Sequence, residues 1–195
     1  KMIIDSCTFS CNTASGDGLF FGILFDSQND TVRIMNNRMF NILDGVSGTM
    51  RYIHIRSVAA GGNNFTYIQN NFLSMMTGNN INNNVGAIEY SGSNPNYARI
   101  ASNTIRIGST LTSGGTSGSV GSSALLIATT SATSTYEIKN NILINERSGG
   151  TAGLQHVAFA ATNTSAVFDI DYNTYNSSSG MLVRWGATVY TDIPS

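Results

Sequence analysis

The sequence predicts an all-β fold, a right-handed parallel β-helix (solenoid) of about six coils with three short strands in each coil. Three observations lead to this prediction. A motif of isoleucine and asparagine recurs along the chain, the residues before it alternate between apolar and polar, and a second apolar run lies between successive copies. Recurrence at this length is typical of solenoids, in which each repeat packs on its neighbours.

The recurring motif places a turn residue three positions after an isoleucine and an apolar residue two positions later. Isoleucine fills the first position in every copy, and asparagine fills the turn position in every copy but the first, which has Cys7. The spacing between copies is 30 to 38 residues, which is one coil in this interpretation. The six copies span residues 4–9, 34–39, 68–73, 100–105, 138–143 and 170–175.

The residues that lead into the motif follow the two-residue period of a β-strand. Only Thr66 departs from an apolar residue two positions before the isoleucine, in the series Met2, Val32, Thr66, Ala98, Tyr136 and Phe168. The position between is polar or charged in most copies, as at Arg33, Arg99, Glu137 and Asp169. We therefore expect the isoleucines to point inward and the charged residues outward.

A second apolar run in each repeat predicts the third strand of each coil. These runs lie at residues 18–25, 52–55, 86–90, 124–128, 156–159 and 181–185. Connections rich in Gly, Ser and Asn join them, such as residues 108–123, of which we expect residues 114–123 to form a flexible loop. Coils stacked at about 4.8 Å would give a rod roughly 25 to 30 Å long.

The asparagines of the motif are expected to form a ladder at one corner of the solenoid, because stacking puts equivalent residues above one another. Asparagine tolerates the left-handed backbone conformation that a tight corner requires. Stacked amides also hydrogen-bond to one another, as in cross-β assemblies. Cys7 begins the series without an amide, so the ladder should start one coil later. Its predicted members are Asn37, Asn71, Asn103, Asn141 and Asn173.

Other interpretations of the repeat fit less well. The asparagines could lie in solvated loops, but five of them share one register. A β-sandwich should show hairpins with two-residue turns such as Asn-Gly, and a propeller blade needs four strands. Neither pattern recurs in this sequence.

The composition is that of a β-rich extracellular protein with many turns. Only 11% of residues are charged, against about 25% in an average soluble domain, while 41% are hydrophobic. The net charge of −1 without a basic patch argues against nucleic acid as a partner. No apolar run approaches the roughly 20 residues of a membrane span. Cys7 and Cys11 could form a disulfide or pack as small hydrophobic residues.

The chain is expected to form a single β-helix domain, residues 1–195, that belongs to a longer chain. It opens inside the first strand motif, and neither end offers a helix or crossing loop to cover the apolar end of a solenoid.

The repeat resembles the right-handed parallel β-helix family with pectate-lyase-like coils. The last third is similar to a segment that recurs in very large secreted surface proteins of Bacteroidota, on the stretches "NNILINERSGGT" (140–151), "DYN" (171–173) and "GMLVRW" (180–185). This resemblance implies secretion, attachment to the cell surface, and a structural or adhesive role. Neighbouring segments of the same long chain are then the expected partners, with surface polysaccharide as another.

The catalytic signatures of the best-known enzymes on this fold are missing. The NTD, DD, GHG and RIK motifs of polygalacturonases do not occur, nor do the vWiDH and RxPxxR patterns of pectate lyases. The eleven carboxylates are dispersed, without the adjacent pair that acid/base glycoside cleavage would suggest. The sequence therefore favours a protein that is not an enzyme.

A carbohydrate site could still form where distant coils meet on the third strand. Its candidates are His54, Arg56, Glu89, Tyr90, His156 and Trp185. If they face outward, His54 and Glu89 could act as acid and base, and Tyr90 and Trp185, with Tyr52, could stack on sugar rings. The competing interpretation is ordinary solvent-facing decoration, with Trp185 packed in the core.

No cofactor is expected, although Asp169 and Asp171 could bind Ca²⁺ together with loop carbonyls. Solvated charge is the competing interpretation of these two carboxylates.

Two functions from different classes remain. The first is a non-catalytic rod that spaces or presents loops as part of a secreted cell-surface protein. The second is a polysaccharide-active enzyme, or a carbohydrate-binding module, on the same fold. An ice-binding face is not expected, because Arg38, Phe72 and Ile142 interrupt the threonine column that it would need.

Overall fold

The computed structural model describes residues 1–10, 20–26, 31–40, 50–56, 64–76, 85–92, 97–112, 114–129 and 131–193. Throughout these ranges the regular elements are β-strands. They contain no helix that is long and apolar enough to cross a membrane. Cys11 lies outside them, and Cys7 carries a free thiol.

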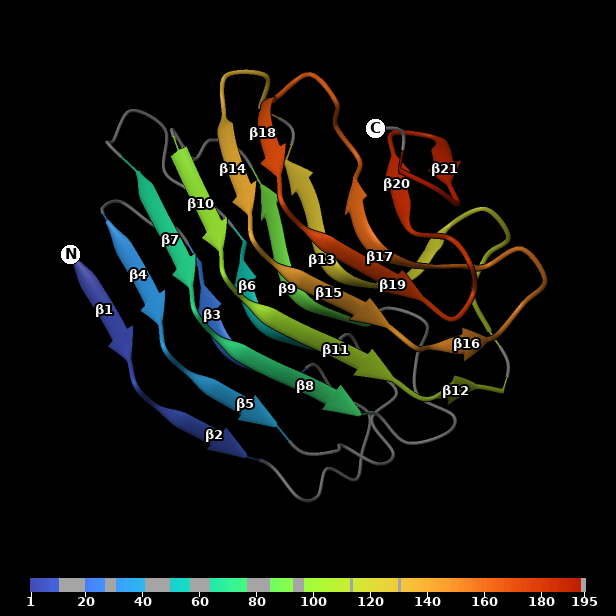
Figure 1. The fold of residues 1–195 in the computed structure, drawn as a ribbon, viewed down its shortest axis with the longest axis horizontal. Coiled ribbons are helices and arrows are strands. Elements are labelled where there is room, and N and C mark those ends of the chain that lie inside the picture. Colours follow the sequence, from blue (N-terminus) through green and yellow to red (C-terminus); the bar gives the residue numbers. More distant parts are fainter. Residues whose placement is uncertain are drawn as a thin grey trace.

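Most strands belong to three large sheets, parallel except at the final β20–β21 pair, and the strands of each sheet stack along one axis (Figure 1). The first sheet contains β1 (Met2–Asp5), β4 (Val32–Met35), β7 (Phe65–Gln69), β10 (Tyr97–Ala101), β14 (Thr135–Lys139) and β18 (Val167–Asp171). The second contains β2 (Thr8–Ser10), β5 (Arg38–Phe40), β8 (Phe72–Met76), β11 (Thr104–Gly108), β15 (Ile142–Asn145) and β19 (Thr174–Ser177). The third contains β3 (Phe20–Phe25), β6 (Met50–Ile55), β9 (Val85–Gly92), β13 (Val120–Thr129), β17 (Gln155–Ala161), β20 (Val183–Trp185) and β21 (Thr188–Tyr190).

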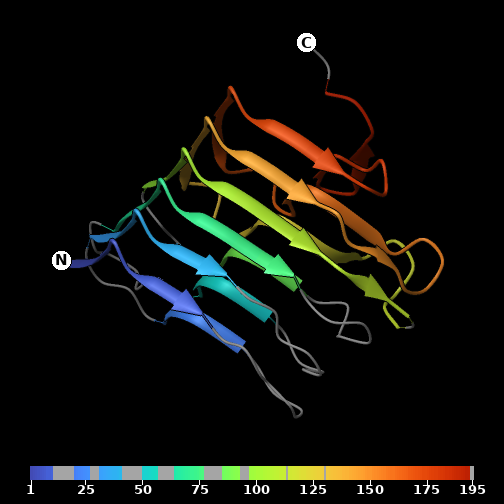
Figure 2. The same cartoon turned by 60° about the horizontal axis from the view of Figure 1, so that its bottom comes forward.

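Neighbouring strands come from successive coils, so the colours pass from blue to red up the stack in Figure 2. The motif isoleucines face one another in register from Ile4 and Ile34 at one end to Ile138 and Ile170 at the other. This arrangement is a parallel β-solenoid, and it confirms the predicted fold class.

About four of the predicted six coils are fully enclosed. Their motif isoleucines, Ile34, Ile68, Ile100 and Ile138, have no solvent exposure. Ile4 and Ile170, in the first and last coils, are only partly buried against the core. The solenoid therefore has about four fully enclosed turns, with a partly buried coil on either side.

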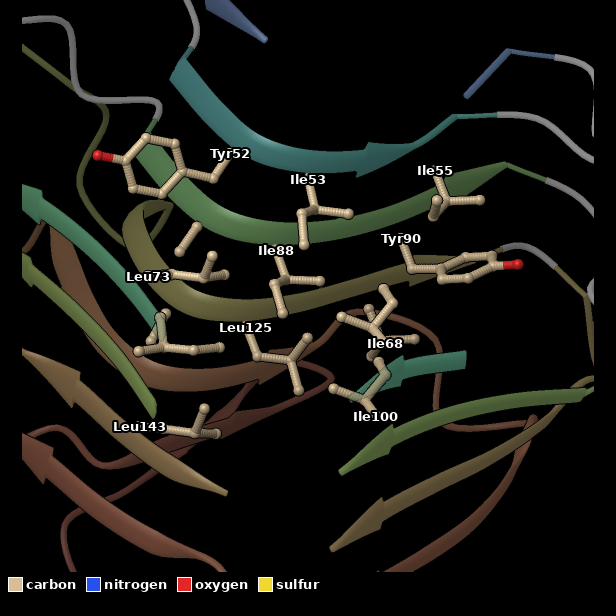
Figure 3. Packing of buried hydrophobic residues seen from close by; sticks show 14 of the residues in the cluster. Tyr52, Ile53, Ile55, Ile68, Leu73, Ile88, Tyr90, Ile100, Leu125 and Leu143 are labelled. Carbon is tan, nitrogen blue, oxygen red and sulfur yellow. The ribbon is translucent and has the colours of Figure 1, made fainter. Parts of the chain in front are cut away.

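The core fills the space between the three sheets (Figure 3). Ile53, Ile88 and Leu125 of the third sheet stack in register and point toward the isoleucine column of the first sheet. Each such side chain contributes about 1.5–3 kcal/mol when it is fully buried. Thr66, the polar exception in the inward series, is buried with its hydroxyl 3.0 Å from that of Tyr90.

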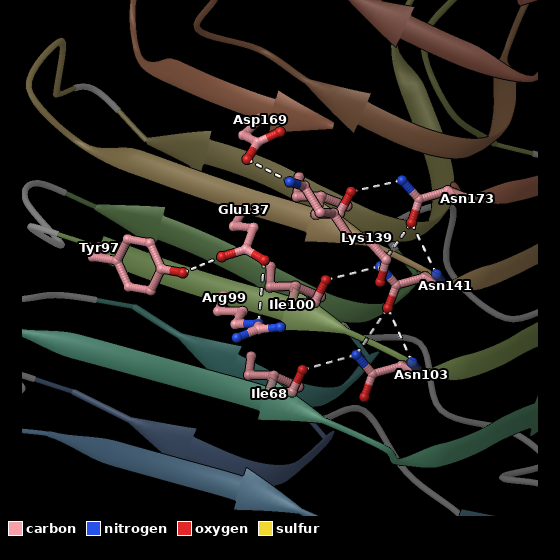
Figure 4. Close-up of polar contacts among 11 residues, drawn as sticks. Ile68, Tyr97, Arg99, Ile100, Asn103, Glu137, Lys139, Asn141, Asp169 and Asn173 are labelled. Atoms are coloured by element: carbon pink, nitrogen blue, oxygen red, sulfur yellow. Dashed lines mark hydrogen bonds and ion pairs between the residues drawn. The ribbon is translucent and has the colours of Figure 1, made fainter. Parts of the chain in front are cut away.

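The motif asparagines form a continuous column of hydrogen bonds at the corner between the first and second sheets. Each Nδ2 donates to Oδ1 of the next coil's asparagine, at 3.0, 2.9, 3.0 and 2.8 Å in the order Asn37, Asn71, Asn103, Asn141, Asn173. Each of these Oδ1 atoms also accepts the backbone N–H of the asparagine below at 2.9–3.0 Å. The predicted ladder is confirmed (Figure 4).

The ladder is also tied to the isoleucine column. The second Nδ2 proton of Asn103 goes to the carbonyl of Ile68 at 2.9 Å, and the other members bond in the same way. In the first coil Cys7 has no amide to continue the column. Its backbone N–H donates to Asn37 Oδ1 at 3.0 Å, and Asn37 Nδ2 donates to the carbonyl of Ile4 at 3.0 Å, as expected for a ladder that starts one coil later.

The corner itself is turned one residue earlier than the sequence suggested. The left-handed residue precedes each ladder position, with φ of 54° to 57° at Ser6, Asn36, Asn70, Ser102, Asn140 and Tyr172. A left-handed residue bends the chain so that the following side chain points inward. The ladder asparagines are therefore selected for their hydrogen bonds and not for their tolerance of the left-handed region.

Two connecting segments are more regular than expected. Within residues 108–123, expected to be a connecting loop, β12 (Thr110–Leu111) pairs in parallel with β16 (Ser148–Gly149) of the next coil. Near the end, β21 turns back to pair antiparallel with β20, so this segment does not begin another parallel coil.

Candidate functional site

His54 and Glu89 come together on the outer side of the third sheet, as the sequence predicted. They are register partners on β6 and β9, and His54 Nε2 lies 3.6 Å from Glu89 Oε1. The same Nε2 lies 2.7 Å from Ser91 Oγ. The sequence identified neither Ser91 nor the fourth member of this group, Arg51, whose Nε donates to Glu89 Oε2. We call Arg51, His54, Glu89 and Ser91 the β6–β9 cluster.

A bend in β6 brings Arg51 and His54 to one side. Strict alternation would put residues three positions apart on opposite faces of a strand. Here both Tyr52 and Ile53 point into the core, so the alternation breaks between them and their flanking residues both face outward. Gly86, the register partner of Arg51, leaves space for its side chain, since a Cβ there would lie 3.3 Å from Arg51 Cδ.

The β6–β9 cluster is largely withdrawn from solvent, and its charges are matched. The side chains of Arg51 and Glu89 are 3% and 12% exposed, and Arg51 also donates to the carbonyl of Met50 at 2.7 Å. Burial lowers the pKa of the Arg51 guanidinium, which Glu89 partly offsets. Burial also lowers the pKa of His54, with Glu89 acting in the opposite direction. His54 is therefore mainly neutral at pH 7.

Arg56 lies apart from the β6–β9 cluster. Its guanidinium is 3.8 Å from Asp26 on the neighbouring coil, and both side chains are about half exposed. Arg56 and Asp26 thus form a solvent-exposed ion pair between the first two coils.

The predicted aromatic platform does not form on the outer face. Tyr90 has no solvent exposure and packs edge-on against Tyr136, with ring centroids 5.5 Å apart. Tyr52 is also in the core, where its hydroxyl donates to the carbonyl of Ser74 at 2.9 Å. The bend in β6, and the inward register of Tyr90 beside Ile55, explain why these rings face the interior.

Trp185 packs against the core, as the competing interpretation of this residue expected. Its ring lies 4.7 Å from that of Phe168 and 6.4 Å from that of Phe159, near the last coil. It also lines a small apolar pocket of about 250 Å³ with Val183, Tyr190, Asp192 and Ile193.

His156 is in a separate buried group, which corrects the expectation of a shared outward face. It occupies the register position of Ser122 and not that of Leu126, the position that aligns with Glu89. Its Nδ1 lies 2.8 Å from Ser122 Oγ and its Nε2 lies 3.0 Å from the carbonyl of Gly149. Asn145 Nδ2 completes the group by donating to Ser122 Oγ at 3.0 Å.

This second group contains the buried Arg147. The desolvation of Arg147 lowers its pKa to about 10. Burial lowers the pKa of His156, and the nearby Arg147 charge lowers it further. The group closes the corner between the second and third sheets in the fifth coil.

The two aspartates considered for calcium differ in their contacts. Asp169 lies 2.6 Å from Lys139 Nζ (Figure 4). Asp171 instead accepts the backbone N–H of Tyr172 at 2.9 Å. Within the described ranges, no three His, Cys, Asp or Glu side chains group in a way that could hold a metal ion.

Comparisons with protein-family models, with curated proteins and with solved structures found no match.

Proposed function

We propose that this chain is a non-catalytic rod segment of a secreted cell-surface protein, with a structural or adhesive role in which the solenoid holds the connecting loops at fixed spacing. The observation that carries the proposal is the asparagine column. It joins successive coils through buried amide pairs in addition to the three sheet ladders. Such a column resists shear between coils, because sliding would leave several buried polar groups without partners.

The contacts of the β6–β9 cluster support the same proposal. Arg51 occupies one oxygen of Glu89, and His54 faces the other. A general acid or base needs a free edge within hydrogen-bonding reach of a substrate, whereas these groups mainly bond to one another across two coils.

Protease treatment of intact cells tests whether the chain lies at the cell surface. In the organism that produces the chain, brief protease treatment of intact cells should release fragments that contain the 140–151 stretch, while a cytoplasmic marker stays intact. Retention of the whole chain until the cells are lysed would contradict a surface role.

The second candidate is a polysaccharide-active or saccharide-binding site at the β6–β9 cluster, and the approach of His54 to Glu89 at 3.6 Å favours it. The purified chain is incubated with acidic and neutral polysaccharides, and reducing ends and unsaturated products are measured. The rod proposal predicts no release above a Glu89→Gln control. Release that disappears in Glu89→Gln and in His54→Gln would replace the rod by an enzyme.

A further inference from the structure

A group of aromatic and cationic side chains lies on the outer face of the first sheet, away from the β6–β9 cluster. Arg33, Tyr67 and Arg99 occupy one register column on β4, β7 and β10. Phe65 and Tyr97 face each other in the next column. We call these five residues the aromatic strip. They point outward, because the residues between them, such as Ile34, Thr66 and Ala98, are buried in the core.

The rings of the strip form one continuous surface group. The centroid of Tyr97 lies 6.5 Å from that of Phe65 and 6.1 Å from that of Tyr67, with tilted planes in both pairs. All three side chains are partly exposed. Aromatic rings on a sheet surface offer apolar faces for the CH groups of a sugar, and the tyrosine hydroxyls add hydrogen bonds. Three such rings in contact are more than the scattered single apolar residue expected on a protein surface.

The cationic end of the strip is at Arg33. Its guanidinium carbon lies 4.4 Å from the centroid of the Tyr67 ring, and no carboxylate of the described residues pairs with it. Arg99, in contrast, lies 3.3 Å from Glu137, and Glu137 also accepts the hydroxyl of Tyr97 (Figure 4). Of the two arginines of the strip, Arg33 is therefore the one whose charge no described carboxylate neutralises, and it is the cation that an anionic ligand group would meet.

The rest of the same face has the opposite charge. Beyond Arg99 the column continues with Glu137 and Asp169, and the adjacent column ends at Asp171. Lys139 is the one cation among them, and Asp169 neutralises it at 2.6 Å. The exposed Asp5 begins the adjacent column in the first coil. Carboxylates therefore flank the strip at both ends along the solenoid axis, and they disfavour an anionic polymer everywhere but at the strip.

We propose that the aromatic strip binds a carboxylate-bearing glycan, with sugar rings against Tyr67 and Tyr97 and a carboxylate against Arg33. This proposal rests on the adhesive part of the proposed function and names the class of ligand for it. It is independent of the other part, the attachment of the rod to a cell surface. The arginine contributes a charge-assisted hydrogen bond, for which a planar guanidinium suits a carboxylate.

Calorimetric titration of the whole chain tests the proposal with two probes of equal length, an alginate-derived oligouronate and a neutral cello-oligosaccharide. The oligouronate should bind more tightly, and its affinity should fall as salt rises. Arg33→Gln should weaken oligouronate binding about tenfold, as expected for the loss of one charge-assisted hydrogen bond. Arg33→Lys should retain part of the affinity, and Tyr97→Leu should weaken both probes.

Arg38→Gln is the matched control. Arg38 belongs to the same coil as Arg33 and lies 5.7 Å from the Phe40 ring centroid, but on the second sheet. It should leave binding unchanged. The proposal is overturned if neither probe binds, if the neutral probe binds as tightly, or if the Arg33 and Arg38 variants lose affinity equally. Oligouronate binding by a chain that protease does not release from intact cells would sustain the strip and refute the surface location.

Discussion

The asparagine column and the β6–β9 cluster both join coils through buried polar side chains, but they differ in how they repeat. The column has the same geometry from Asn37 to Asn173, with nearly equal distances at every step. The β6–β9 cluster occurs once, where a bend in one strand and a glycine in the next allow an arginine to reach a glutamate. The repeated contact maintains the fold, whereas the single contact fastens one pair of coils.

The largest effect is expected from Asn103→Ala. Loss of the Asn103 amide leaves three buried groups without their partner: the backbone N–H of Asn71, the Nδ2 of Asn71 and the carbonyl of Ile68. We expect the free energy of unfolding to fall by about 3–5 kcal/mol, since each unsatisfied buried group costs about 1–3 kcal/mol. Urea unfolding followed by circular dichroism measures it.

Asn70→Gly is the control for this change. Asn70 is exposed, has φ of 54°, and donates to Asn36 Oδ1 at 2.7 Å outside the column. Its loss should change stability by no more than about 0.5 kcal/mol. Equal losses in the two variants would show that the buried column is not special.

A smaller loss is expected from Arg51→Met, which keeps the length of the side chain but leaves Glu89 largely buried without its cation. We expect about 2–3 kcal/mol, below the full cost of breaking a wholly buried pair because Glu89 retains some solvent contact. Arg106→Met, which breaks an exposed pair with Glu146 at 2.7 Å, should cost less than about 1 kcal/mol. The same denaturation assay compares them, and a larger loss from Arg106→Met would reverse the comparison.

A further effect concerns pH. Burial lowers the pKa of both His54 and His156 below the ordinary value of 6.5, so the folded chain binds fewer protons than the unfolded chain. The contribution of these histidines to stability is therefore fully present above about pH 6.5. It declines as the pH falls from about 6.5 toward the lowered pKa values, by at most about 1.4 kcal/mol per pH unit for each histidine, and levels off below them. Unfolding midpoints at pH 7.5, 6.0 and 5.0 measure this decline. A midpoint that rises on acidification would contradict it.

The features of this molecule that follow from the stacking of the repeats could be predicted from the sequence, and those that depend on the local geometry of one coil could not. Five asparagines at one register predict a column, because stacking carries each coil's pattern onto the next. The approach of His54 to Glu89 follows from the same stacking. The bend in β6 does not, since nothing in the two-residue period reveals that Tyr52 and Ile53 both point inward.

The same limit explains Arg51, Tyr90 and His156. Arg51 could be assigned to the β6–β9 cluster from the sequence only by noticing that its register partner, Gly86, is a glycine. The placement of Tyr90 and His156 depends on which side of each third strand faces the core, and their short apolar runs do not fix it. The aromatic strip was present as alternating residues of the first sheet, but its rings come from separate repeats and become neighbours only in the fold.

The column also makes each coil an interchangeable unit. Ladder positions are separated by 30 to 38 residues, yet the amide geometry does not change, so the connections absorb every difference in length. Each asparagine donates through Nδ2 to the asparagine of the next coil, so all these hydrogen bonds point in the same direction along the axis. Duplicating or deleting one whole winding would therefore rejoin the amide chain without a fault. A gene encoding such a solenoid can lengthen or shorten its product by recombination between repeats, and the reach of the product can change without redesign of its interior.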